Sequence, residues 1–226
     1  MMQNKGMKLL FDAAKYAWID RKLQKEVKRR FYSNQSFAKI DRDLLAAYIF
    51  KNPYTISKNY LKKHQEKKIH TYGETPLVTY EKIAQELDLQ STDTFLELGS
   101  GRGRGALFLH HFYHCNVIGI ERIPQFVKLA SHLTQKYHIE GVTFNCADMV
   151  HANLPPVTVV YLYGTCLEDR DIAFLIDRLK TLPKGTRIIT ISYPLTDYDE
   201  KTFQIKKSFT LSFPWGETEG YLQTIH

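Results

Sequence analysis

The stretch DTFLELGSGRGRG, residues 93–105, decides the fold of this chain. Its first half alternates polar and apolar residues and ends in an apolar run, which predicts a buried strand. Its second half has glycine at every other position, so the backbone can adopt positive φ angles and a ligand can approach it closely. The apolar run 106–109 then predicts a helix. Strand, glycine turn and helix together predict the ligand-binding corner of an open α/β sheet.

The glycine loop leaves the ligand open between two classes. A dinucleotide-binding loop has the pattern Gly-x-Gly-x-x-Gly, whereas here Arg104 stands at the third glycine position and Gly105 follows one residue late. Glu97 lies two residues before the first glycine and would repel a pyrophosphate but attract a cationic amino group. Arg102 and Arg104 instead favour a ligand that contains phosphate, because guanidinium groups bind phosphates well.

Composition indicates an ordinary globular protein. The 226 residues are enough for one core and an appendage, with 43% hydrophobic and 24% charged residues. Three cysteines without a Cys-x-x-Cys pair are typical of a reducing compartment. No apolar run predicts a signal peptide or a membrane span, so we expect a cytoplasmic protein.

The positive charge is concentrated in the first third of the chain. Residues 1–72 contain 17 Lys and Arg against 6 Asp and Glu, while residues 73–226 contain 14 against 18. A basic leader predicts an acidic partner, such as a nucleic acid, a membrane surface or an acidic protein face. The alternative is a solvated helical face that docks on the acidic remainder of the same chain.

Hydrophobic periodicity predicts a basic helical extension over residues 1–71 and a sheet domain over residues 72–226. In the extension, helices are expected near 9–32, 41–50 and 56–66. In the sheet domain, helices are expected near 77–87, 124–137 and 168–179, and strands near 93–98, 117–121, 142–146, 157–163 and 187–193. Alternating strands and helices indicate a parallel sheet with right-handed crossovers, although the link 148–156 is too short for a full helix. Two extended runs around the turn Pro214-Trp215-Gly216 predict an antiparallel hairpin at the end.

With these elements placed, the chain from Tyr72 onward resembles the class I S-adenosylmethionine-dependent methyltransferases. The resemblance implies an α/β, Rossmann-like sheet of seven strands, mostly parallel with an antiparallel C-terminal hairpin, and S-adenosylmethionine as cofactor. Glu121 matches the acidic residue that holds the ribose, and Asp148 the acidic residue near the adenine. The cofactor-binding residues implied in this way are Tyr72, Thr75, Glu97, Gly99, Ser100, Gly101, Gly103, Glu121, Arg122, Asp148, Met149 and Tyr163.

Two shorter segments are similar to narrower groups. The segment YGET, residues 72–75, is similar to the histone-lysine methyltransferases of the disruptor-of-telomeric-silencing family. The segment from 161–165 through 185–187 resembles bacterial relatives of that family and the mitochondrial ATP-synthase c-subunit lysine methyltransferases. However, YGTC at 163–166 replaces the Asn-containing motif of the first group, and the Asn/Asp-Pro-Pro-Tyr signature is missing. The likeness therefore implies methylation of a protein lysine or another amine, without support for a histone.

Three residues after the fourth predicted strand are the candidates for catalysis. Tyr163, Thr165 and Glu168 follow that strand, where the methyl group is expected to lie. Tyr163 has the alternative of simple packing, and Glu168 that of a favourable charge in the first helical turn. Residues 110–115 contain three histidines and a cysteine, but no fourth ligand is evident from the spacing, so we expect no metal site.

Two other functions stay open. The basic extension is compatible with an RNA methyltransferase, because phosphate backbones bind basic surfaces. A glycine loop in an α/β sheet is also compatible with a nicotinamide-dependent oxidoreductase or a non-catalytic nucleotide-binding protein.

Overall fold

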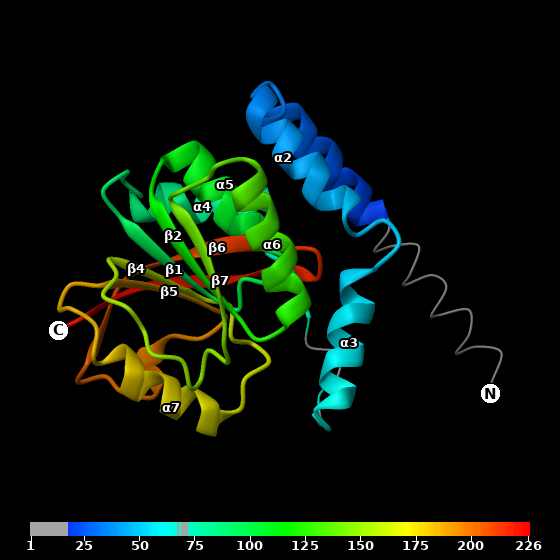
Figure 1. Ribbon diagram of the computed structural model, residues 1–226. Coiled ribbons are helices and arrows are strands. Elements are labelled where there is room, and N and C mark those ends of the chain that lie inside the picture. Colours follow the sequence, from blue (N-terminus) through cyan, green and yellow to red (C-terminus); the bar gives the residue numbers. More distant parts are fainter. Residues whose placement is uncertain (1–17, 67, 69–71) are drawn as a thin grey trace, which may run out of the picture.

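The computed structural model describes residues 18–66, 68 and 72–226, and its centre is a seven-stranded sheet (Figure 1). The strand order is β3-β2-β1-β4-β5-β7-β6. The strands are β1 (Thr94–Leu98), β2 (Asn116–Glu121), β3 (Val142–Cys146), β4 (Val159–Leu162), β5 (Arg187–Ile191), β6 (Phe203–Phe213) and β7 (Gly216–Ile225). Strands β1 to β5 pair in parallel, and β7 pairs antiparallel with both β5 and β6. The predicted fold class, including the C-terminal hairpin, is confirmed.

Helices cover both faces of this sheet (Figure 1). Strands buried on both sides place alternate residues in different layers. Phe95 of β1 and Tyr161 of β4 belong to the core beneath α4 and α5, whereas Leu96 and Val160 belong to the core beneath α7. The helices of the sheet domain are α4 (Leu77–Leu87), α5 (Arg104–Tyr113), α6 (Pro124–Lys136), α7 (Asp169–Leu179) and the short 3-10 helix η1 (Leu195–Asp197). The connection from Cys146 to Val159 has neither helix nor strand, as predicted.

The extension differs in detail from the prediction. Its described part contains a helical stretch over residues 18–31, α2 (Gln35–Ala46) and α3 (Pro53–Lys63), and the predicted helical residues 9–17 lie outside the described part. The segment 33–36, which interrupts the periodicity, begins α2, because the Asn34 side chain accepts a hydrogen bond from the Phe37 amide at 3.1 Å. Asn52-Pro53 likewise begins α3, with Asn52 as its N-cap. A predicted start at residue 41 for the second helix was therefore wrong.

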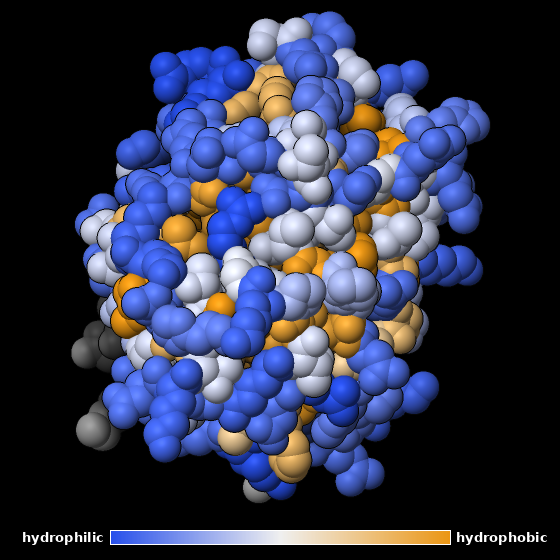
Figure 2. Space-filling view, turned by 90° about the vertical axis from the view of Figure 1, so that its left-hand side faces the viewer, coloured by the Kyte–Doolittle hydropathy of each residue, from blue (hydrophilic) through white to orange (hydrophobic). Residues whose placement is uncertain are grey.

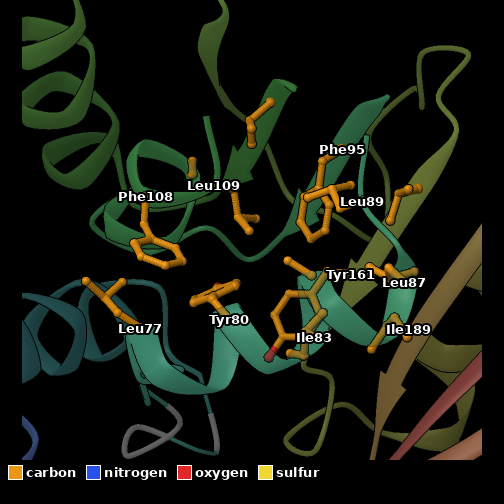
Figure 3. Packing of buried hydrophobic residues seen from close by; sticks show 14 of the residues in the cluster. Leu77, Tyr80, Ile83, Leu87, Leu89, Phe95, Phe108, Leu109, Tyr161 and Ile189 are labelled. Atoms are coloured by element: carbon orange, nitrogen blue, oxygen red, sulfur yellow. The ribbon is translucent and has the colours of Figure 1, made fainter. Parts of the chain in front are cut away.

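The extension and the sheet domain share one apolar core. Val27, Phe31 and Phe37 belong to the same buried cluster as Leu77 and Phe108. Figure 3 shows this cluster where α4 lies against the sheet, with the Tyr80 and Tyr161 rings side by side. The extension is thus held by burial of large side chains, worth about 1.5–3 kcal/mol each.

The surface near the C-terminus is mainly hydrophilic, with small separate hydrophobic areas (Figure 2). In the part of the chain that the structure describes, no helix is both long and apolar enough to cross a membrane.

Candidate active site

A cavity of about 990 Å³ opens where the parallel strands end. The residues that line it include one from just beyond or at the carboxyl end of each parallel strand: Gly99, Glu121, Ala147, Tyr163 and Ser192. Such ends meet at one edge of an α/β sheet, where ligands bind. Ten of the predicted site residues line this cavity: Tyr72, Gly99, Gly101, Glu121, Arg122, Asp148, Met149, Tyr163, Thr165 and Glu168. Thr75, Glu97, Ser100 and Gly103 were predicted with them but do not line it.

The glycine loop forms one wall of the cavity. Gly99, Gly101 and Gly103 have φ angles of 83°, 53° and 73°, which only glycine adopts readily. Gly103 packs inward, because a Cβ atom there would overlap the Phe144 ring. Gly101 faces the cavity, and a Cβ atom there would lie 3.4 Å from the Tyr72 ring. The loop therefore offers bare backbone to a ligand at Gly99 and Gly101.

Glu121 is fixed beside that backbone. Its carboxylate accepts hydrogen bonds from the amides of Gly101, at 2.9 Å, and Ile123, at 2.8 Å. Burial raises the pKa of Glu121, while these backbone hydrogen bonds oppose the rise. The carboxylate keeps unused lone pairs at the cavity and suits hydroxyl donors.

Glu97 lies in the core behind the loop and is only 3% exposed. Tyr80 donates a hydrogen bond to Oε1, whereas Oε2 is buried without a partner. Burial raises the pKa of Glu97 to about 8; hydrogen bonds from Tyr80 and the Ala106 amide counteract this, and the charge of Glu121 adds to it. Thr75 is bound to the Tyr161 hydroxyl at 2.6 Å. Thr75 therefore belongs to the layer that packs around Glu97.

Both loop arginines are already paired with carboxylates. Arg102 donates two hydrogen bonds of 2.6 Å to Glu74, and Arg104 donates to both oxygens of Asp41, at 2.7 and 2.8 Å. Although burial opposes it, Arg102 keeps the pKa of Glu74 below its usual value. The two guanidinium groups thus fasten the 72–75 segment and α2 to the loop. Neither loop arginine is therefore free to bind a pyrophosphate. The sequence did not predict these two ion pairs, because 28 residues separate Arg102 from Glu74 and 63 separate Arg104 from Asp41.

A second wall of the cavity is aromatic, because Tyr163 and Trp215 both line it. Tyr163 stacks on Phe213 with ring centroids 5.0 Å apart, and Phe213 stacks on Trp215 at 5.3 Å. The Trp215 indole N–H donates to the Tyr163 hydroxyl at 2.7 Å. Burial raises the pKa of Tyr163, so this hydroxyl stays protonated at neutral pH. Trp215 was not among the predicted site residues; its only signal was the predicted turn that contains it.

Charged side chains surround this aromatic wall. Glu168 and Asp171 line the cavity from the start of α7, where their charge also favours the helix N-terminus. Lys68 of the extension lies 3.7 Å from Glu168, and both side chains are more than half exposed. Cys166 also lines the cavity, and burial raises the pKa of its thiol, so a nucleophilic role has no support.

The extension supplies the remaining wall. Ser57 and Leu61 of α3 line the cavity together with Glu66, which forms an ion pair with Arg122. Arg122 also lies 3.9 Å from Asp148. Elsewhere, the His110 Nδ1 atom is hydrogen-bonded to the Cys115 carbonyl oxygen. No cluster of three metal-ligating residues occurs among residues 18–66, 68 and 72–226.

Comparison with known proteins agrees with the predicted resemblance. Residues 53–145 match the family model of the histone methylation protein DOT1, which is less than half of the chain. No curated protein matches the sequence.

Solved structures share the fold. An RNA methyltransferase from Salinibacter ruber, crystallised with S-adenosyl-L-homocysteine, is 25% identical with a TM-score of 0.57, over 68% of this chain and 94% of its own. TrmN from Thermus thermophilus is 14% identical with a TM-score of 0.60, over 68% and 50%. The E81Q mutant of MtNAS is 16% identical with a TM-score of 0.56, over 93% and 78%. This last match extends over most of this chain.

Proposed function

We propose, on the premise that the chain is a class I S-adenosylmethionine-dependent methyltransferase, that it methylates a cationic amine, namely a protein lysine side chain. The observation that carries this choice of acceptor is that Tyr163 and Trp215, both stacked on Phe213, line the same cavity as Glu168. The faces of aromatic rings attract ammonium groups, and a carboxylate adds direct charge complementarity.

The described residues fit S-adenosylmethionine as cofactor. Glu121 presents a fixed carboxylate for the ribose hydroxyls, and the bare backbone at Gly99 and Gly101 allows close approach. Arg102 is hydrogen-bonded to Glu74 and is not available to bind a phosphate, and S-adenosylmethionine contains no phosphate. When bound, the cofactor supplies an electrophilic methyl group.

The chain's own residues would orient the acceptor amine and accept the proton that it loses. The aromatic wall would hold the amine in line for displacement, and orientation of this kind is worth up to about 7–11 kcal/mol. The amine has to lose its proton before attack. Glu168 would accept that proton, directly or through water, while the protonated Tyr163 hydroxyl keeps Trp215 in place.

A second candidate acceptor is RNA. The relative from Salinibacter ruber is an RNA methyltransferase by its description, and the extension carries exposed lysines and arginines. Bases also stack on aromatic side chains, so Trp215 suits this acceptor as well. Glu168 and Asp171 disfavour RNA, because carboxylates at the cavity repel phosphates.

Transfer of a radiolabelled methyl group separates these acceptors. The protein is incubated with labelled S-adenosylmethionine and a cell extract, and portions are then treated with protease or with ribonuclease. We expect protease alone to release the label, and amino-acid analysis to find it in methyl-lysine. Label released by ribonuclease would replace the lysine proposal with the RNA proposal.

The choice of cofactor has its own measurement. A ligand that binds only the native state raises the melting temperature. We expect S-adenosylhomocysteine to stabilise the protein and NAD to leave it unchanged. Stabilisation by NAD alone would favour the dinucleotide function that the sequence left open.

A further inference from the structure

Four large apolar side chains are exposed at one end of the extension. Trp18, Ile49, Phe50 and Tyr54 have exposed fractions of 63%, 70%, 96% and 57%. We call these four residues the apolar tip. Ile49 and Phe50 lie in the connection between α2 and α3, which protrudes at the side of the molecule opposite the C-terminus (Figure 1). Phe50 is almost fully exposed, so it contributes little to the stability of the fold.

Trp18 comes from the helical stretch 18–31, Ile49 and Phe50 from the connection between α2 and α3, and Tyr54 from α3, yet the four residues gather at the same end. Arg104 donates both to Gln24 in the stretch 18–31 and to Asp41 in α2, so these helices lie side by side. They run antiparallel, because a short turn at 32–34 joins them. Trp18 is at the start of the stretch 18–31, six residues before Gln24. It therefore lies next to the C-terminal end of α2, which Ile49 follows in the chain.

Basic residues lie beside the apolar tip. Arg21, Lys22 and Lys51, which are close to tip residues in the sequence, are exposed and form no ion pair within the described residues. The Lys22 ammonium group lies 5.5 Å from the Trp18 ring, and Asp20 is an acidic neighbour at this end. Asp41, Asp43 and Glu66 of the extension form ion pairs with the sheet domain, while many basic residues of the extension stay exposed.

We propose that the apolar tip docks this protein on the surface of an anionic phospholipid bilayer. Isoleucine and phenylalanine gain free energy by entering the acyl boundary, and tryptophan and tyrosine prefer the headgroup level. Lysine and arginine near the surface are attracted by anionic lipids. An RNA would explain the basic residues and the rings, but it offers nothing to the aliphatic Ile49 side chain.

The position of the apolar tip gives the docking a consequence for the cavity. Tyr54 packs edge-on against Tyr72 with ring centroids 5.2 Å apart, and Tyr72 lines the cavity. The helix α3 begins at Pro53 and contributes Ser57 and Leu61 to the same cavity. Docking would therefore bring the cavity close to the membrane surface. The inference does not depend on the proposed methyl acceptor.

Vesicle sedimentation with the full chain tests the proposal. Wild-type protein is mixed with vesicles of phosphatidylcholine alone or with about 30% phosphatidylglycerol. We expect at least tenfold stronger partitioning onto the anionic vesicles, falling when the salt is raised to about 0.5 M. The double variant Ile49→Ser/Phe50→Ser should lose at least tenfold in partitioning, and Lys22→Glu/Lys51→Glu should lose a similar factor.

Phe174→Ser is the matched control, since Phe174 is 50% exposed on α7 and lies outside the apolar tip. It should partition as the wild type does, and all variants should keep the wild-type melting temperature. Equal binding to neutral and anionic vesicles would overturn the proposal, as would unchanged binding by the Ile49→Ser/Phe50→Ser variant. A tip-dependent affinity for a single-stranded RNA without vesicle binding would assign the surface to nucleic acid instead.

Discussion

The two walls of the cavity are built in different ways. The glycine-loop wall consists of backbone and of Glu121, which accepts hydrogen bonds from the backbone amides of Gly101 and Ile123. Gly101 lies in the loop after β1, and Ile123 comes two residues after Glu121, the last residue of β2. The aromatic wall joins Tyr163 to Trp215, 52 residues apart, and Trp215 is half exposed. The first wall is rigid and set by local backbone geometry. The second depends on tertiary contacts of the half-exposed Trp215 with Tyr163 and Phe213, and such a wall is free to vary with the acceptor.

The variant Gly101→Val is expected to have the largest effect, because it fills the rigid wall. A side chain at Gly101 would occupy the space between the loop and Tyr72, and valine at a φ of 53° is strained. We expect the affinity for S-adenosylhomocysteine to fall at least about 100-fold, equivalent to about 2.7 kcal/mol. Titration calorimetry measures this loss.

Gly185→Ala is the control for strain alone. Gly185 has a φ of 83°, and a Cβ atom there meets nothing within 4 Å. This variant should lose about 1–2 kcal/mol of stability and bind S-adenosylhomocysteine normally. If Gly101→Val retained wild-type affinity, the loop would not be the ligand-binding wall.

Glu121→Gln tests the side chain of the same wall. The Gly101 and Ile123 amides bind different carboxylate oxygens, so glutamine keeps an acceptor for only one of them, and it also loses the charge that strengthens bonds from hydroxyl groups. We expect the affinity for S-adenosylhomocysteine to fall by about 1.5–3 kcal/mol, roughly 10- to 100-fold. Calorimetry gives the value, and adenine, which lacks the ribose, should bind both proteins equally. An unchanged affinity for S-adenosylhomocysteine would argue against the ribose assignment.

The rigid wall is also the part that sequence reasoning located best. Glycines at alternate positions and acidic residues at strand ends are local signals, and Gly101 and Glu121 both line the cavity. Glu97 carries the same signal but points into the core toward Tyr80, a contact that depends on how α4 packs. Its burial could not be read from an alternating pattern, because both faces of β1 are covered.

The fold followed from periodicity, but the long-range pairs did not. Arg102 and Arg104 looked like phosphate ligands until their partners Glu74 and Asp41 were placed beside them. Trp215 reached the cavity only through the hairpin of β6 and β7. In each case the missing information was a contact between segments far apart in the sequence, which hydrophobic spacing does not encode.

The variant Glu97→Gln tests the residue behind the glycine-loop wall by comparing how the stability of the variant and of the wild type depends on pH. The pKa of Glu97 is about 8 in the folded protein and near the ordinary value of 4.5 when the chain unfolds. The folded state therefore binds the extra proton between these values, and its contribution to stability is complete below 4.5 and is lost as the pH rises through 8. We expect the wild type to lose up to about 1.4 kcal/mol per pH unit across this window relative to Glu97→Gln.

Denaturant titrations at several pH values give this difference. Glutamine retains an acceptor for the Tyr80 hydroxyl and carries no titratable proton, so the variant isolates ionisation from packing. Parallel pH profiles for the two proteins would mean that Glu97 is ionised in the folded state. The rigid wall would then carry two buried negative charges, Glu97 and Glu121, rather than one.

Trp215→Ala should have the smallest effect of the four, and it acts on the aromatic wall alone. Removing the indole takes away one ring face and the hydrogen bond to Tyr163, while Phe213 remains. Loss of one cation–π contact of about 0.5–2 kcal/mol predicts a rise in the KM for the amine acceptor of about tenfold. Trp215→Phe keeps an aromatic face but loses the N–H group and the larger indole surface, so it should recover part of the affinity. The affinity for S-adenosylhomocysteine should stay unchanged in both variants, since Trp215 contacts Tyr163 and Phe213 and neither substitution alters Gly99, Gly101 or Glu121. A loss of cofactor affinity in Trp215→Ala that matched the rise in KM would show that the two walls act as one site, and the division between a rigid cofactor wall and an adaptable acceptor wall would fail.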